Sequence, residues 1–309
     1  MDNISKNAAN ALLVKHWQEG TTLAALPPAL RPGNGEAAYA VQAHLETHST
    51  QPLFGWKIAA TSVAGQKHIN VDGPIAGRLL AEMVFHDGDT VPFGANRMRV
   101  AEAEFAFYMG RNLPPRARPY AMHEVLDAVS DLYLAIEIPD SRYTDYITVG
   151  APQLIADNAC GHQFVLGPKA PDMWRKLDLA AHRVVGHVGQ RLQREGIGAN
   201  VLGDPRLALT WLANELPTMG ATLAAGHIIT TGTCVVPMDI VPLDTVVMDF
   251  GVLGRCAVVL AGSEAAEAQH QDAYGRICSY QNNRCTSWGH LPIASLKSTF
   301  ARLRKTRAM

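Results

Sequence analysis

Two glutamates separated by one residue form the most chemically suggestive pattern in this chain of 309 residues, and a third glutamate follows later. Glu102 and Glu104 lie in residues 100–109, where small or apolar residues alternate with the acids as in a half-buried β-strand. Because a strand rises roughly 3.3 Å per residue, their side chains project from one face about 7 Å apart. Glu137 lies in a second alternating segment, residues 132–140, on the face opposite its apolar side chains.

Three carboxylates that converge on one point can hold a divalent cation, with water or substrate in the remaining positions. Such hard oxygen donors suit Mg²⁺ or Mn²⁺. The alternative is that the acids form the solvated face of an amphipathic strand, which is the usual state of a half-exposed sheet. The small side chains of Ala103, Ala106 and Ala135 favour a site, because they leave room above the acids for a ligand. The pattern alone leaves both interpretations open.

Nucleophilic catalysis and zinc binding have less support in the sequence. Cys160 and His162 are two residues apart, but no carboxylate partner accompanies them, so we do not expect a Cys–His nucleophile. Cys160 is equally consistent with a small packed residue. The other histidines are scattered and lack the spacing of zinc ligands.

Six segments carry a resemblance to a known family, in the family's order and across about residues 5–262: GWKIAATS (55–62), GPIAGRLLAEMVFHDGD (73–89), AEAEFAF (101–107), AIEIPDSRY (135–143), IADNACGHQFVLG (155–167) and WLANELPTMGATLAAGHIITTGT (211–233). Together they resemble the 2-keto-4-pentenoate hydratase / 4-oxalocrotonate decarboxylase branch of the fumarylacetoacetate hydrolase superfamily. The resemblance implies an α+β fold with a mixed β-sheet roll or sandwich core and an N-terminal helical segment.

The resemblance also implies an activity and a set of site residues. The activity is that of a metal-dependent lyase, a hydratase acting on a small unsaturated 2-oxo acid such as 2-hydroxypenta-2,4-dienoate in aromatic-compound catabolism. Glu102, Glu104 and Glu137 would be the ligands of Mg²⁺ or Mn²⁺, and Lys57 would be the catalytic lysine beside the substrate. The further residues expected near the substrate, or near the third glutamate, are Arg78, Thr233 and Cys160 as substrate contacts and Asp140, Ser141 and Arg142 as residues that orient Glu137.

The chemistry of such a substrate fits this set. A 2-oxo acid can chelate a metal through its carboxylate and its 2-oxo oxygen, and the metal then stabilises the enolate that forms as C3 gains or loses a proton. Lys57 could move that proton or anchor the carboxylate, although a surface lysine is its plainer interpretation. Arg78 could contact an anion or simply be an exposed arginine, and Thr233 could belong to an ordinary packed strand.

Two residues depart from the family's pattern. The family follows its proline with an aspartate, whereas Pro74 is followed here by Ile75, and Asp72 precedes the proline. Cys160 stands where the family has serine, which removes a hydroxyl. These departures favour keeping a 4-oxalocrotonate-type decarboxylase or an acylpyruvate C–C hydrolase as alternatives. An inactive relative that binds the metal and a 2-oxo acid is the alternative from another class.

The surrounding elements indicate how these residues are positioned. We expect helices over residues 6–18, from Glu36, from Val63 with Thr61 or Ser62 as its cap, over 123–132, and from Pro205 with Asp204 as its N-cap. Strands are expected over 227–233, 244–250 and 256–262. Helices early and strands late favour a mixed α+β domain over a doubly wound parallel sheet, and no nucleotide-binding glycine motif follows a strand.

Composition and charge bound the remaining questions. Hydrophobic residues make up 48% and charged residues 18% of a chain with net charge −1, so we expect a globular protein that binds neither nucleic acid nor membranes. Five cysteines without a CxxC pair predict a reducing, cytoplasmic compartment. We expect a homo-oligomer.

The charge is unevenly distributed along the chain. Residues 263–309 hold seven basic and three acidic residues, a net charge of +4, so residues 1–262 carry −5 of the total. We therefore predict one catalytic domain over residues 1–262, helical to about residue 50 and β-rich over about 51–262. Residues 263–309 are predicted to form a basic, disordered tail.

Overall fold

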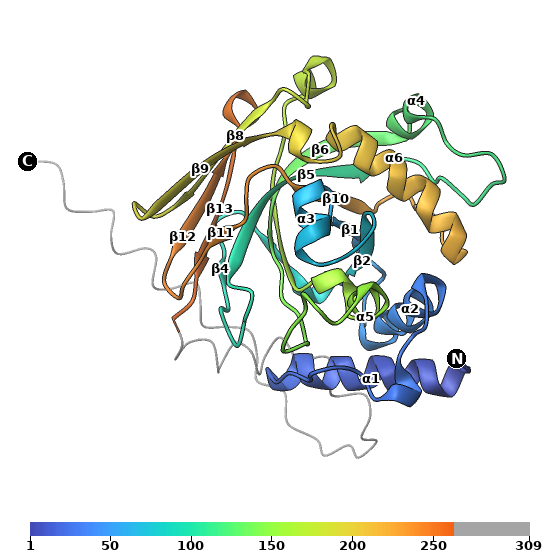
Figure 1. Ribbon diagram of the computed structural model, residues 1–309. Coiled ribbons are helices and arrows are strands. Elements are labelled where there is room, and N and C mark those ends of the chain that lie inside the picture. Colours follow the sequence, from blue (N-terminus) through green and yellow to red (C-terminus); the bar gives the residue numbers. More distant parts are fainter. Residues whose placement is uncertain (263–309) are drawn as a thin grey trace, which may run out of the picture. The chain divides into compact units, whose positions relative to one another are not determined.

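Two mixed β-sheets dominate the computed structural model, which describes residues 1–262 (Figure 1). The larger sheet has the strand order β2-β1-β10-β5-β6-β7-β3, with β11 paired to β5, and the smaller has the order β4-β13-β12-β8-β9. The strands are β1 Gly55–Ala59, β2 Ile75–Leu79, β3 Val84–His86, β4 Thr90–Val91, β5 Val100–Met109, β6 Val129–Ile138, β7 Gln163–Lys169, β8 Arg183–Val188, β9 Leu192–Ile197, β10 Ile228–Thr233, β11 Met238–Asp239, β12 Thr245–Asp249 and β13 Arg255–Leu260.

Helices cover the sheets, and most are short. The α-helices are α1 Asn3–Glu19, α2 Gly35–Gln42, α3 Val63–His68, α4 Met122–Leu126, α5 Ala151–Ala156 and α6 Pro205–Glu215. The longest, α1, begins after the Asp2 cap, whose side chain accepts a hydrogen bond from the Ser5 N–H. Figure 1 shows α1 beside α2 and α5 at one side of the larger sheet, so the expected N-terminal helical segment and mixed α+β architecture are confirmed.

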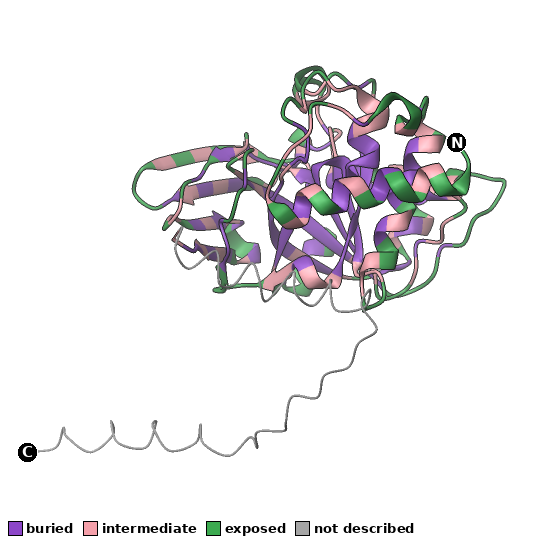
Figure 2. Ribbon diagram, turned by 90° about the horizontal axis from the view of Figure 1, so that it is seen from below, coloured by how far each residue is buried: buried purple, intermediate pink, exposed green. Residues whose placement is uncertain are grey.

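The hydrophobic core lies against one face of the larger sheet. Trp56 on β1, Phe105 on β5 and Leu134 on β6 are almost fully buried there, and Phe105 meets Phe250 edge to face with ring centroids 5.2 Å apart. Figure 2 shows these strands buried along most of their length, whereas α1 has one buried and one exposed side. The described residues 1–262 belong to one compact unit. The tail predicted for residues 263–309 lies outside the described residues.

One expected helix is much shorter than the pattern predicted. Only Met122–Leu126 is helical within the segment expected to be a helix over 123–132, and β6 begins at Val129. Val129 pairs with Met109 of β5, so the ladder between the two long strands extends into the predicted helix. Pairing with a neighbouring strand overrides local helical spacing here. No helix within residues 1–262 is long and apolar enough to cross a membrane.

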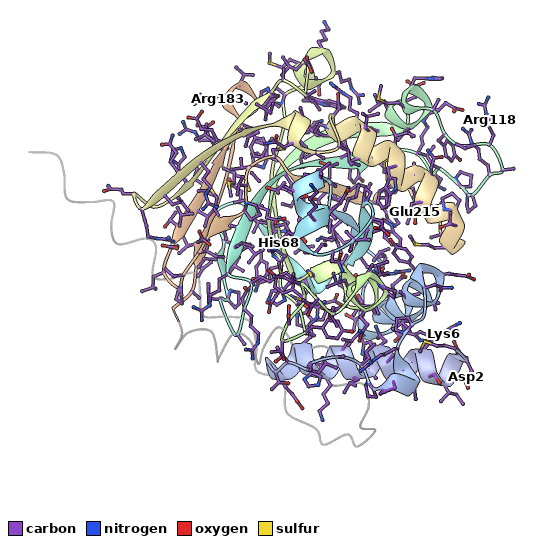
Figure 3. The ribbon with its side chains drawn as sticks, in the orientation of Figure 1. Asp2, Lys6, His68, Arg118, Arg183 and Glu215 are labelled. Atoms are coloured by element: carbon purple, nitrogen blue, oxygen red, sulfur yellow. The ribbon has the colours of Figure 1, made fainter. Side chains whose placement is uncertain are left out.

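Charged side chains lie mostly at the surface. Asp2, Arg118 and Arg183 point outward from three different parts of the fold (Figure 3). Six charged residues within residues 1–262 are instead buried: Lys57, Arg78, Glu104, Glu137, Arg142 and Asp157. Buried charges are rare unless they are paired or bind a ligand, so these six residues indicate where the structure is specialised.

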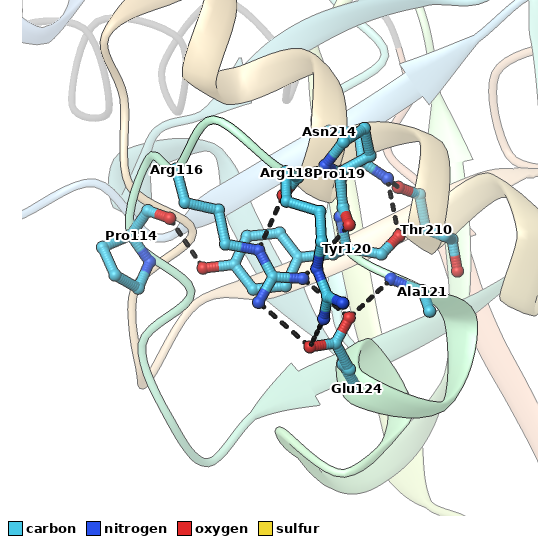
Figure 4. Close-up of polar contacts among 9 residues, drawn as sticks. All are labelled: Pro114, Arg116, Arg118, Pro119, Tyr120, Ala121, Glu124, Thr210 and Asn214. Carbon is cyan, nitrogen blue, oxygen red and sulfur yellow. Dashed lines mark hydrogen bonds and ion pairs between the residues drawn. The ribbon is translucent and has the colours of Figure 1, made fainter.

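The loop before α4 is held to α6 by a group of polar contacts (Figure 4). Asn214 on α6 accepts a hydrogen bond from the Tyr120 N–H at 2.6 Å and donates one to the Tyr120 carbonyl at 3.0 Å. Arg116 stacks on the Tyr120 ring and donates two hydrogen bonds to Glu124 at 2.7 and 3.0 Å. These contacts hold the loop against α6 at the surface of the protein.

Replacing Glu124 should destabilise the protein only above acidic pH. The hydrogen bond from Arg116, together with one from the Ala121 N–H, lowers the pKa of Glu124 from 4.5 to about 2. A lowered pKa means that the carboxylate stabilises the fold above pH about 4.5, and that this contribution is lost as the pH falls toward 2. We expect the difference in Tm between the wild type and Glu124→Gln to be constant above pH 5.5 and to shrink below pH 4.5. Thermal denaturation at several pH values measures it; an equal difference at pH 3 and pH 7 would contradict this account.

Candidate active site

The pairing of β5 with β6 brings the three predicted glutamates together. Glu102 is the cross-strand partner of Glu137, and Glu104 is the partner of Ala135. Because cross-strand partners and residues two apart project to the same face, the three carboxylates share one face of the sheet. One carboxylate oxygen from each glutamate lies within 4.8 Å of those of the other two. Ala103 pairs with Ile136 and therefore lies on the opposite face, so its small side chain does not create the space beside the acids that the sequence suggested.

Lys57 joins this cluster from β1. It is the partner of Thr230 on β10, and Thr230 is the partner of Ala106 on β5, so Lys57 lies on the same face of the sheet as the three glutamates. Lys57 Nζ lies 3.0 Å from Glu137 Oε1 and donates a 2.9 Å hydrogen bond to the Ala159 carbonyl. The side chain is buried, so its charge is held in place by these two partners.

Glu104 is oriented by the end of β10. Its Oε2 accepts hydrogen bonds from the Thr230 hydroxyl and, at 2.8 Å, from the Gly232 N–H. The ladder shifts register between Thr230 and Thr233, which turns the Gly232 N–H toward the carboxylate. Gly232 has a φ of +96°, and a Cβ there would overlap Thr61. Sequence reasoning gave no role to Gly232; the signal was a glycine inside a β-branched strand.

The carboxylates fit a divalent metal ion. Glu104 is 0% and Glu137 1% exposed, yet Glu104 Oε1 and both carboxylate oxygens of Glu137 accept no hydrogen bond from the protein. Buried oxygens without partners are costly, apart from the compensation that Lys57 gives to Glu137. A divalent cation satisfies such oxygens, and three carboxylates are the hard donor set that it prefers.

The titration behaviour of the cluster follows from burial and mutual repulsion. Burial, with a contribution from Glu137, raises the pKa of Glu102 to about 7 against the opposing effect of Lys57. Burial and the charges of Glu137 and Glu102 raise the pKa of Glu104 well above its ordinary value. Burial alone would lower the pKa of Lys57, but the three carboxylates outweigh it and raise that pKa. The cluster therefore favours a protonated lysine and an added cation.

The three residues expected to contact substrate lie in different places. Cys160 is buried near Lys57, and burial raises the pKa of its thiol to about 12, so the thiol is neutral. Thr233 is the register partner of Glu104, and its hydroxyl donates to the Val235 carbonyl. Their contact with substrate stays a prediction.

Arg78 is not brought to the carboxylates. It pairs with Trp56 across β1 and β2, whereas Lys57 pairs with Gly77, so Arg78 and Lys57 project from opposite faces. Its guanidinium forms an ion pair with Glu46 and lies over the Trp56 ring, 4.7 Å from the centroid. These contacts support a structural role for Arg78 and give no support to the predicted substrate contact.

The residues around Glu137 also differ from expectation. Arg142 forms a buried ion pair with Asp157, rather than contacting Glu137. Ile75, at the position of the family's aspartate, is buried in the core, and Asp72 is exposed. No carboxylate replaces the missing aspartate at this point of β2.

Gly77 should tolerate no side chain. A Cβ at this position would overlap the Asn158 carbonyl oxygen and lie 3.0 Å from two carbons of Lys57. We expect Gly77→Ala to destabilise the protein by about 1–3 kcal/mol, the usual cost of overpacking, as measured by urea denaturation. Gly73→Ala is the matched control, because a Cβ there meets nothing within 4 Å. Equal stability of the two variants would contradict the close approach.

A family model described as fumarylacetoacetate (FAA) hydrolase C-terminal matches residues 39–261. A 2-keto-4-pentenoate hydratase from Burkholderia vietnamiensis is 35% identical over 235 residues, which cover 75% of this chain and 88% of that protein. A 2-oxo-hept-4-ene-1,7-dioate hydratase from Escherichia coli is 32% identical over 229 residues, 71% of this chain and 84% of that protein.

A solved structure has a similar fold. The 4-oxalocrotonate decarboxylase from Pseudomonas putida G7, complexed with magnesium and adipate, superposes with a TM-score of 0.76 and 23% identity. The match covers 84% of this chain and 98% of that one. At this identity the likeness concerns the fold alone, and it agrees with the mixed α+β architecture predicted from the sequence.

Proposed function

Since this chain belongs to the fumarylacetoacetate hydrolase family, we propose that it is a divalent-metal-dependent hydro-lyase acting on a small unsaturated 2-oxo acid such as 2-hydroxypenta-2,4-dienoate, in the catabolism of aromatic compounds. The observation that carries the proposal is the match, at over 30% identity and over most of their length, to relatives named as hydratases. The buried cluster of Glu102, Glu104 and Glu137 beside Lys57 supports it.

The roles of the residues follow from the geometry. Glu102, Glu104 and Glu137 would hold Mg²⁺ or Mn²⁺, which supplies Lewis-acid stabilisation of negative charge on the 2-oxo oxygen of the substrate. Thr230 and Gly232 fix one oxygen of Glu104, so its other oxygen stays directed toward the cluster. Lys57 would give a proton to C3 of the substrate or remove one, as the general acid or base. Burial of these side chains excludes bulk water from the reacting atoms.

Decarboxylation is the second candidate, and the residue on β2 favours it. Ile75 stands where the family's hydratases are expected to carry an aspartate that handles water. Loss of CO₂ from a vinylogous 3-keto acid uses the same electron sink and needs no activated water. An acylpyruvate C–C hydrolase would need such a water, and an inactive relative would bind the metal and a 2-oxo acid without turnover.

Turnover should depend on the metal and distinguish these activities. We expect the protein with Mg²⁺ to consume 2-hydroxypenta-2,4-dienoate, followed by ultraviolet absorbance, without releasing CO₂. EDTA should abolish the reaction and added Mg²⁺ or Mn²⁺ should restore it, because Glu104 Oε1 and Glu137 Oε2 receive neither a hydrogen bond nor an ion pair from the described residues. Release of CO₂ from 4-oxalocrotonate alone would favour the decarboxylase. Activity that persists in EDTA would contradict the metal's role, and oxalate binding without any turnover would favour the inactive relative.

The homo-oligomer and the cytoplasmic location stay predictions. Analytical ultracentrifugation of the full chain measures the first, and fractionation of the source cells measures the second.

A further inference from the structure

Three consecutive residues before β7 adopt a left-handed backbone. Asn158, Ala159 and Cys160 have φ values of +57°, +51° and +60°. A Cβ disfavours this conformation, so a run of three non-glycine residues persists only where the surroundings hold it. Gly161, the one residue with conformational freedom, follows the run with an ordinary φ of −62°. We call residues 158–160 the left-handed turn.

Asn158 ties the left-handed turn to β2. Its Oδ1 accepts a hydrogen bond from the Arg78 N–H at 2.6 Å, and its Nδ2 donates to the Arg78 carbonyl at 2.8 Å. The side chain is buried, and it pairs with both backbone groups of one residue on the terminal strand of the larger sheet. The Asn158 carbonyl lies over Gly77, where a side chain would exclude it.

Arg142 and Asp157 stabilise the residues that flank the left-handed turn. Arg142 donates to the carbonyls of Asp157 and, at 3.0 Å, of Gly161, and it pairs with the Asp157 carboxylate. That carboxylate also accepts a 2.7 Å hydrogen bond from the Ser141 hydroxyl. One buried guanidinium therefore fixes the residues on both sides of the turn.

The carbonyl at the centre of the left-handed turn faces Lys57. The neighbouring carbonyls are used within the segment or by adjacent backbone: Asn158 accepts from the Gly161 N–H at 2.8 Å and Cys160 accepts from the Asp140 N–H at 3.0 Å. The Ala159 carbonyl accepts from Lys57 Nζ at 2.9 Å, and Nζ reaches Glu137 at 3.0 Å. The backbone conformation thus directs one acceptor at the buried ammonium.

We propose that Asn158 is a positioning residue that acts through Lys57: by holding the left-handed turn on β2, it places the Ala159 carbonyl so that the ammonium stays beside Glu137 and faces the substrate. The inference deepens the proposed function and rests on it for the role of Lys57 in proton transfer. It assigns control over the direction of the proton-carrying group to an amide side chain whose two hydrogen bonds both go to the Arg78 backbone.

A double-mutant cycle with Lys57 tests this. Asn158→Gly keeps a residue that tolerates positive φ and removes both hydrogen bonds to Arg78. We expect kcat to fall about 10²-fold with KM and Mn²⁺ affinity nearly unchanged, as for a misplaced catalytic group. In a Lys57→Met background the same substitution should change kcat less than about 2-fold. An equal loss in both backgrounds, or no loss in the wild-type background, would overturn the proposal.

The chain offers a matched control for the hydrogen bonds themselves. Asn214 pairs with the N–H and the carbonyl of Tyr120 as Asn158 pairs with those of Arg78, but it lies at α6 (Figure 4). We expect Asn214→Ala to lower Tm and leave kcat unchanged. If Asn158→Gly fails to fold, Asn158→Asp replaces it, because the carboxylate keeps the acceptor for the Arg78 N–H and loses the donor to the Arg78 carbonyl.

A measurement that needs neither substrate nor metal tests the positioning role of Asn158 separately from the proposed hydro-lyase function. The buried Lys57 ammonium should give a slowly exchanging signal in ¹⁵N-edited NMR of the lysine side chains, assigned by its absence in Lys57→Met. We expect Asn158→Gly to lose this protection and Asn214→Ala to keep it. If the wild type turns over no tested acid, the proposed function fails, while protection that survives in Asn158→Gly overturns the positioning role.

Discussion

Glu104→Gln is expected to abolish metal-dependent turnover and, at the same time, to raise the Tm of the metal-free protein. The amide keeps an oxygen that accepts from Thr230 and Gly232, so the local structure should survive. It removes one of three buried acids, each of which has an oxygen within 4.8 Å of those of the other two. Crowded buried acids destabilise the metal-free fold, because they either repel one another or must be protonated at a raised pKa, so removing one of them stabilises it.

The same substitution removes one of the three proposed ligands of the cation. Loss of even an outer partner of a metal ligand costs about 10–100-fold in affinity, so we expect at least a 10²-fold weaker Mn²⁺ affinity by calorimetry and an undetectable kcat. Glu19→Gln is the control: this glutamate on α1 is exposed, and its 3.9 Å contact with Lys15 contributes little. Unchanged Mn²⁺ affinity in Glu104→Gln would remove Glu104 from the site.

Lys57→Met should have the complementary effect. Methionine occupies a similar volume, and the substitution removes the ammonium that compensates Glu137 at 3.0 Å. We expect kcat to fall about 10²- to 10⁴-fold, the range of general acid–base catalysis, with Mn²⁺ binding retained. The metal-free protein should lose stability, because removing one partner of a buried pair leaves the other uncompensated.

The two variants should therefore shift the Tm of the metal-free protein in opposite directions. Metal-free Glu104→Gln should melt above the wild type and metal-free Lys57→Met below it, and saturating Mn²⁺ should restore much of the stability of the second. Lys67→Met, on the exposed face of α3, controls for loss of a positive charge. If Lys57→Met retains kcat while Tm falls, Lys57 serves the structure and not proton transfer.

Local pattern was sufficient to predict several elements. The alternation in residues 100–109 corresponds to β5 Val100–Met109, and helix α6 has the expected Asp204 cap and begins at Pro205. Ser62 caps α3, as one of the two residues considered. These elements carry their signals in side chains adjacent in sequence, such as a capping oxygen or an apolar stripe.

Other elements left no such signal. All five residues of β2 are buried, including Arg78, so its sequence shows no alternation of apolar and polar residues. Strands buried on both faces resemble short pieces of any core element, which is why β2 was not predicted. The expected helix over 123–132 ends early for a related reason, since Val129 and Leu132 pair with β5.

The site residues also include some that the sequence indicates and others that only the folded chain brings together. The glutamates could be proposed because two of them share a strand face, and Lys57 because of the family resemblance. The roles of Thr230, Gly232 and Asn158 depend on a register shift and on a left-handed turn, which arise only when distant strands meet. Arg78 is the opposite case, because its position in the sequence suggested a substrate contact that the fold does not support. It follows Gly77, the partner of Lys57, by one residue along β2, so its side chain projects from the opposite face of the sheet.

The place of β10 between β1 and β5 has a consequence for how the protein matures. β1 at Gly55–Ala59 and β5 at Val100–Met109 are not neighbours in the sheet; β10, at Ile228–Thr233, separates them and supplies both donors to Glu104. The segment between β5 and β10 is long, so bringing these two strands together is slow compared with pairing β5 with β6. During synthesis on the ribosome, the carboxylates of β5 and β6 can meet early, but the lysine and the threonine–glycine cradle join them only after residue 233 has emerged. The proposed cation site is therefore completed only late in the synthesis and folding of the protein.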